Sequence, residues 1–102
     1  MSLWVFQDIS FNNYIAYINP SEIGVVKSVA SGTPVLWNYI ETTSDTKANV
    51  TATVDASGVV YVAYQRSSDG KVVIRAISAN GTTRLWIKIF LPDPAIGTYT
   101  NP

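Results

Sequence analysis

The side chains that could do acid–base or metal chemistry in this chain are carboxylates, because the sequence contains no histidine and no cysteine. That composition removes the usual general base, the commonest metal ligand and any thiol nucleophile. Two carboxylate pairs stand out because each member falls at a strand end or a turn, Asp8 with Asp55 and Glu22 with Asp69. Paired acids or Ca²⁺ ligands are one interpretation of these residues.

Turn stabilisation is the other interpretation, and it fits the carboxylates better. An Asp side chain at a turn accepts hydrogen bonds from the backbone N–H groups that follow it. The alternating acidic spacing of a Ca²⁺ loop is missing, and the six glycines are isolated rather than gathered in a phosphate-binding loop. We therefore expect no enzyme activity, no catalytic residue, no bound metal and no cofactor.

The charge balance limits the kinds of partner. Seven Lys and Arg residues balance seven Asp and Glu residues, and the basic ones are scattered singly, so we expect no nucleic-acid binding. The apolar runs are far shorter than the roughly 20 residues that span a bilayer, so we expect no membrane insertion. The first residues lack the pattern of a secretory signal peptide, and without cysteine no disulfide can form. An intracellular protein is expected.

Aromatic residues are the more promising binding groups. Tyr and Trp combine a large apolar surface with one polar atom, and they are enriched at protein interfaces. Two tyrosines three residues apart on a strand point to opposite faces, so one of each pair should be buried and the other exposed or at a seam. All of them could instead be core residues, or they could stack on sugar rings. The candidate partner-binding residues are Tyr14, Tyr17, Trp37, Tyr61, Tyr64 and Trp86.

These aromatics recur because the chain contains an internal repeat. The segment Tyr-Ile-Ala-Tyr at residues 14–17 returns as Tyr-Val-Ala-Tyr at residues 61–64, an offset of 47 residues. The same offset matches Asp8 with Asp55, Ser10 with Ser57, and Val25-Val26 with Val72-Val73. After two insertions the offset becomes 49, which matches Ala30, Gly32, Leu36 and Trp37 with Ala79, Gly81, Leu85 and Trp86. We infer a duplication, with one β motif at residues 1–45 and a second at residues 46–92.

The sequence predicts four antiparallel strands in each copy, and little or no helix. β-Branched and aromatic residues fill the strand segments, and turn residues separate them. Ser68-Asp69-Gly70 is a hairpin signal, and Asn80-Gly81 is typical of a two-residue type I′ turn. Polar residues 41–48 form the expected linker, and residues 93–102 an extended tail. The expected strands span residues 3–8, 13–18, 23–30 and 34–41, then 49–55, 59–66, 71–78 and 84–91.

The second copy resembles a β-propeller blade. Asp55, Gly58 and Tyr61-Val62-Ala63 are similar to the first turn and second strand of bacterial blade repeats, and Asn80-Gly81 with the later Trp86 is similar to their second motif. The first copy departs from this pattern with Phe11 at the position of the turn glycine. The resemblance implies two tandem blade-type sheets packed together. As a short, cysteine-free chain of two motifs, it is also similar to small orphan proteins of filamentous viruses infecting hyperthermophilic archaea, which would imply a host-cell cytoplasm.

A pair of blade-like sheets predicts an interaction protein. Propellers typically close with four to eight blades, so two blades leave free edges whose unpaired N–H and C=O groups can accept an added strand. We expect a non-enzymatic protein–protein interaction module that binds an extended peptide in the groove between the two motifs. Two alternatives stay open: a carbohydrate-binding lectin formed when several chains close into a ring, and a structural component of a larger particle. Self-association is part of both.

Overall fold

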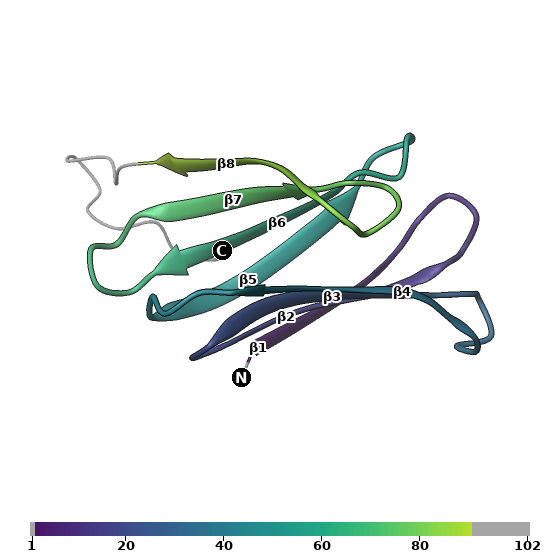
Figure 1. Cartoon of the computed structure of the whole chain (residues 1–102), viewed down its shortest axis with the longest axis horizontal. Helices are drawn as coiled ribbons and strands as arrows, with labels where there is room; N and C mark the ends of the chain where they lie inside the picture. Colours follow the sequence, from purple (N-terminus) through teal and green to yellow (C-terminus); the bar gives the residue numbers. More distant parts are fainter. Residues whose placement is uncertain (1, 91–102) are drawn as a thin grey trace.

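The computed structural model describes residues 2–90, and these form an all-β protein without a helix (Figure 1). Eight strands make two four-stranded antiparallel sheets, each in simple sequence order. The predicted pair of meander motifs is therefore confirmed, whereas the expected tail at residues 93–102 lies outside the described residues. The first sheet contains β1 (Ser2–Gln7), β2 (Asn13–Asn19), β3 (Glu22–Ser28) and β4 (Val35–Thr42); the second contains β5 (Lys47–Val54), β6 (Val60–Arg66), β7 (Val72–Ile77) and β8 (Arg84–Phe90).

Alternating side chains give each sheet one face that meets the other sheet. In β2, Tyr14 and Ala16 are buried while Ile15 between them is exposed, as the two-residue period of a strand requires. We call the face of each sheet that meets its neighbour the inner face, and the opposite one the outer face. The core between the inner faces contains Tyr14, Ala16, Ile18, Ile23 and Val25 from the first sheet and Val50, Val60, Val62, Tyr64, Val73 and Ile77 from the second.

The two sheets approach each other most closely along their first strands. β5 lies against β1 and β2, and Figure 1 shows β7 and β8 separated from β3 and β4. Long side chains bridge this wider side. Trp37 of β4 reaches the turn between β7 and β8, where its Nε1–H donates a 3.1 Å hydrogen bond to the carbonyl oxygen of Ala79. The sheets therefore form a wedge that is narrow at β1 and β5 and filled by side chains elsewhere.

Strand register supports the internal repeat and corrects one detail of its alignment. Ile18 lies opposite Ile23, whereas Gln65, 47 residues after Ile18, lies opposite Val72, 49 residues after Ile23. Both extra residues therefore lie in the β6–β7 hairpin loop, and the predicted match of Val25-Val26 with Val72-Val73 is wrong. Their structural equivalents are Ile74 and Arg75. With this shift the cross-strand rows coincide, Tyr14–Lys27–Trp37 in the first sheet and Tyr61–Ala76–Trp86 in the second.

The turn at Asn80-Gly81 is not the predicted two-residue type I′ turn. That turn needs positive φ at both central residues, but only Gly81 has it, at 72°. The Gly81 N–H donates to the carbonyl oxygen of Ser78, and the Ser78 N–H donates to that of Thr83, so a longer connection closes the hairpin. The Asn80 side chain accepts hydrogen bonds from the backbone N–H and hydroxyl of Thr82, which holds the longer loop in place.

The linker between the sheets is also shorter than predicted. Residues 41–48 are polar, but β4 continues to Thr42 and β5 begins at Lys47, which leaves residues 43–46 as the connection. The Lys47 ammonium is almost fully buried, and the carbonyl oxygens of Asn19, Thr43 and Asp45 each accept a hydrogen bond from it. A buried charge is tolerated when it is paired and hydrogen-bonded. A charged residue such as Lys47 can therefore lie within a strand, and the polar composition of residues 41–48 did not show where the strands end.

Candidate functional site

The six candidate aromatics do not line one groove. Tyr14 and Tyr64 are buried between the two sheets, and Trp37 packs edge-on against Tyr14 with ring centroids 6.2 Å apart. Tyr17 is half-buried on the outer face of the first sheet. Tyr61 and Trp86 lie together on the outer face of the second sheet, with ring centroids 5.9 Å apart. Three of the six therefore hold the sheets together, and the other three are on outer faces.

The two tyrosine pairs split between faces, as their spacing predicts. Tyr14 is buried and Tyr17 half-buried in the first repeat, whereas Tyr64 is buried and Tyr61 half-buried in the second. The buried partner is thus the first tyrosine of one pair and the second tyrosine of the other. This exchange shows that the repeats do not meet through equivalent faces.

The carboxylates Asp8 and Asp55 stabilise turns, in agreement with the sequence interpretation. Asp8 Oδ1 accepts from the backbone N–H groups of Ser10 and Asn12, and the Tyr14 hydroxyl donates a 2.8 Å bond to its Oδ2. Partial burial raises the pKa of Asp8, but the hydrogen bonds from Asn12, Tyr14 and Ser10 outweigh it, and the pKa lies below its ordinary value. A carboxylate held in its ionised form by structural donors is poorly suited to proton transfer.

The second carboxylate pair also serves local structure. Asp69 accepts hydrogen bonds from the Arg66 guanidinium within the β6–β7 loop, and its Oδ2 lies 3.8 Å from the ammonium of Lys71. Glu22 accepts a 3.2 Å hydrogen bond from the Asn19 side chain at the start of β3. No group of three or more His, Cys, Asp or Glu residues in the described part of the chain could hold a metal ion.

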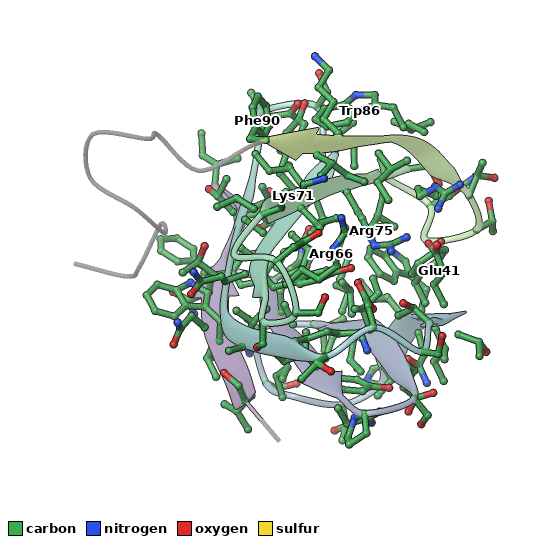
Figure 2. All side chains as sticks on the ribbon, turned by 90° about the vertical axis from the view of Figure 1, so that its left-hand side faces the viewer. Glu41, Arg66, Lys71, Arg75, Trp86 and Phe90 are labelled. Carbon is green, nitrogen blue, oxygen red and sulfur yellow. The ribbon has the colours of Figure 1, made fainter. Side chains whose placement is uncertain are left out.

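A charged cluster that the sequence interpretation missed links the two inner faces. Glu41 of β4 pairs with Arg75 of β7 and lies 2.6 Å from an Arg84 guanidinium nitrogen of β8 (Figure 2). Arg75 is only 5% exposed, and it also donates a 3.0 Å hydrogen bond to the Tyr64 hydroxyl. Burial, followed by the hydrogen bond to Glu41, raises the pKa of Tyr39 to about 12. Repeat matching could not reveal the cluster, because its members have uncharged equivalents.

The outer face of the first sheet is apolar. Val5 is 62% exposed and lies opposite Ile15, whose other neighbour in register is Val26. Tyr17 and Ile40 extend this surface toward β4 across Gly24. Burial, and after it the nearby Glu22 carboxylate, raise the pKa of Tyr17, so a charged group borders this stretch at one end. Soluble monomers rarely expose large contiguous apolar patches, and such patches mark interaction surfaces.

The outer face of the second sheet carries Trp86 and Phe90 on β8. Figure 2 shows both side chains on the side of β8 that points away from the first sheet. Lys88 between them holds its ammonium 5.0 Å from the Trp86 ring centroid, where cation and ring attract each other. All seven residues of β8 are exposed, and no described strand pairs with its free edge.

An open groove lies at one end of the seam between the two repeats. Its volume is about 470 Å³, within the usual range for small ligand sites, and the linker forms one of its walls. Ile18 and Pro20 contribute from the first sheet, and Asp45, Ala48 and Asn49 from the linker and β5. None of the six candidate aromatics lines it. Its polar and aliphatic lining differs from the aromatic lining that the sequence analysis predicted for a groove between the repeats.

Within residues 2–90, no helix is long and apolar enough to cross a membrane. Comparison of the chain with protein-family models, with curated proteins and with solved structures finds no match.

Proposed function

We propose that this chain is a non-enzymatic protein–protein interaction module. The observation that carries the proposal is the pair of apolar outer faces, one on each sheet. Val5 and Ile15 on the first sheet and Trp86 and Phe90 on the second are all more than a third exposed. Water contact with such surfaces is unfavourable by roughly 25 cal/mol per Å² of apolar area, so covering them favours association.

The non-enzymatic part of the proposal rests on composition and on the roles of the polar groups. The chain has no histidine or cysteine, Asp8 and Asp55 are engaged in turns, and Glu41 is engaged by two arginines. An intracellular setting, in a host-cell cytoplasm if the chain is viral, belongs to the same proposal. It rests on the absence of cysteine and on the resemblance described above.

Besides a protein that covers the outer faces, we propose an extended peptide as a ligand. Its site would be the groove at one end of the seam between the two repeats. The groove provides exposed polar side chains at Ser44, Thr46 and Asn49 beside the aliphatic surface of Ile18 and Ala48. Each backbone hydrogen bond to a bound peptide contributes a net ~0.5–1.5 kcal/mol, against an association cost of ~4–15 kcal/mol. A short segment anchored here alone would bind weakly, so contacts on an outer face would have to add affinity.

The experiment is selection from a displayed library of random peptides, followed by NMR titration of the selected sequences. Shifts of the Ile18 and Ala48 amides would place the peptide in the groove, and shifts of the Trp86 indole would place it on the outer face. Two variants provide matched controls. Ser44→Trp puts a large ring at the groove and should abolish binding there only, whereas Trp86→Ser should abolish binding only on the outer face.

Selected peptides that bind and that lose binding in one of the two variants would support the proposal. If no peptide binds and the chain also fails to associate with itself, the proposed function is wrong. A glycan-array signal that Trp86→Ser removes, without any peptide binding, would instead indicate the carbohydrate-binding alternative.

A further inference from the structure

The two sheets meet through different faces of the same repeat unit. Tyr14 is on the inner face of the first sheet, but its equivalent Tyr61 is on the outer face of the second. Conversely, Tyr64 is on the inner face of the second sheet, and its equivalent Tyr17 is on the outer face of the first. The outer face of each sheet is therefore equivalent, by repeat alignment, to the inner face of the other sheet.

We infer that the partner of the outer faces is a second copy of this chain, bound head to tail. The outer face of the second sheet in one chain covers the outer face of the first sheet in the next, and it repeats the arrangement already present between the two sheets of one chain. This inference rests on the proposed function and names the partner.

The tryptophan contact shows what the repeated interface would contain. Trp37 lies so close to Gly81 that a Cβ on that glycine would be 2.2 Å from the indole ring. The equivalent pair is Trp86 and Gly32, because Trp86 occupies the register position of Trp37, and Gly32 is hydrogen-bonded to Val29 as Gly81 is to Ser78. Nothing lies within 4 Å of the position that a Cβ on Gly32 would take. Each chain thus presents an unfilled glycine turn and an exposed tryptophan.

The hydrogen bond that Trp37 donates to the second sheet has no counterpart at Trp86 in the described part of the chain. Trp37 Nε1–H donates to the carbonyl oxygen of Ala79 in the turn that contains Gly81. The equivalent of Ala79 is Ala30, in the turn that contains Gly32. Within residues 2–90, no group accepts a hydrogen bond from the Trp86 indole N–H. Docking Trp86 on the Gly32 turn of the next chain would supply one.

The charged cluster provides a second, independent argument. Register makes Phe90 the equivalent of Glu41, because Glu41 lies opposite Ile23 and Phe90 opposite Val72. By the same register, Val26 is the equivalent of Arg75 and Val35 the equivalent of Arg84. Inside the chain, Glu41 faces Arg75 and Arg84. At the free faces, the equivalent Phe90 would face Val26 and Val35 of the next chain. All three positions change together, from charged to apolar, as two surfaces that meet would require.

Head-to-tail contacts of this type generate closed rings when the rotation between copies closes, and filaments when it does not. Because propeller-like rings contain roughly four to eight sheets, a closed ring would contain two to four copies of this two-sheet chain. The internal wedge, narrow at β1 and β5 and wider at β4 and β8, has the taper that a ring requires.

A mixing experiment tests the inference, with light scattering after size-exclusion chromatography as the readout. Val35→Lys damages only the outer face of the first sheet, and Phe90→Lys damages only that of the second; both residues are about half exposed. The wild-type chain should have at least twice the monomer mass of 11.1 kDa. Each variant alone should be monomeric. An equal mixture should form dimers, because one undamaged face of each kind remains.

Controls separate folding from assembly. Ser57→Lys adds the same charge at an exposed turn and should leave the wild-type mass unchanged. If Phe90→Lys does not give a cooperative thermal transition, Trp86→Ser replaces it in the mixture. A monomeric wild-type chain at millimolar concentration would overturn the inference but not a positive peptide-binding result. Variants that each stay assembled alone, or a mixture that stays monomeric, would also overturn it.

Discussion

The turn after β1 and the turn after β5 have the same backbone but different side chains. In both, the Asp side chain accepts hydrogen bonds from the N–H groups two and four residues later, and its carbonyl oxygen accepts from the N–H three residues later. Both also place a tyrosine hydroxyl 2.8 Å from the Asp Oδ2. Yet the residue with positive φ is Gly58 in one turn and Phe11 in the other.

The Asp side chain, rather than the glycine, therefore determines the shape of the turn. Phe11 adopts a φ of 64°, which costs a residue with a Cβ roughly 1–2 kcal/mol. The turn keeps its conformation because the backbone and side-chain hydrogen bonds to Asp8 are the same as those to Asp55. Equivalent positions in the two repeats can therefore be compared directly by substitution.

The largest effect is expected for Glu41 and its equivalent Phe90. Glu41→Gln leaves the nearly buried Arg75 without its carboxylate partner. Removing one partner of a buried pair costs about 3–5 kcal/mol, so urea unfolding should show a loss of that size. Phe90→Ser in the monomer should cost less than about 1 kcal/mol, because Phe90 is exposed and has no such partner. Equal losses would contradict the assignment of these faces.

Gly81 and Gly32 should give the next largest difference. Both have positive φ, so alanine at either position adds backbone strain of roughly 1–2 kcal/mol. Gly81→Ala also forces a methyl group into the Trp37 ring, and overpacking adds about 1–3 kcal/mol. Thermal unfolding of dilute protein should therefore show a larger loss for Gly81→Ala than for Gly32→Ala. If the two variants are equally stable, Trp37 does not dock on the Gly81 turn.

Asp8 and Asp55 predict how stability depends on pH. Both pKa values are lowered in the folded chain, so each Asp stabilises the fold above its unfolded pKa of about 3.9. That contribution is lost as the pH falls through the lower folded values. Asp8→Asn should flatten the acid limb of a stability curve more than Asp55→Asn, because Asp8 also accepts from Asn12 and lies 4.0 Å from Lys27. The reverse order would refute this ranking.

Phe11 and Gly58 should give the smallest effects, with opposite signs. Phe11→Gly relieves the positive-φ strain but adds freedom to the unfolded chain, so a gain of about 0.5–1 kcal/mol is expected. Gly58→Ala should lower the free energy of unfolding by about 1–2 kcal/mol. The alanine would keep the positive φ of Gly58, and its Cβ would lie 3.1 Å from the Cβ of Ala79. Chemical denaturation of both variants measures the pair. Destabilisation by Phe11→Gly would show that the exposed ring stabilises the fold.

Much of the fold could be predicted from the sequence. Segments such as Val60–Arg66 alternate between residues for the two faces, and turn residues separate them, so all eight strands were expected. The ends were less predictable, because they depend on partners far away in the chain. Lys47 belongs to β5 because carbonyl oxygens of Asn19 and the linker surround its ammonium. The residue type alone does not show which distant groups will surround a polar side chain.

The candidate site was only partly predictable. The sequence identified the aromatic residues and showed that each tyrosine pair must divide between faces, but it could not say which member faces the other sheet. That choice is made by packing, which buries Tyr14 in one repeat and Tyr64 in the other. The pairing of Glu41 with Arg75 was also hidden, because it joins residues 34 positions apart on different sheets.

The indoles of Trp37 and Trp86 provide the most direct test of whether one interface is used twice. Hydrogen exchange of the indole N–H groups, followed by NMR over a range of protein concentrations, distinguishes Trp37 from Trp86. We predict that Trp37 is protected at every concentration, and that Trp86 becomes protected as concentration rises and the chains associate. Rapid exchange of Trp86 at all concentrations, with Trp37 protected, would contradict the account.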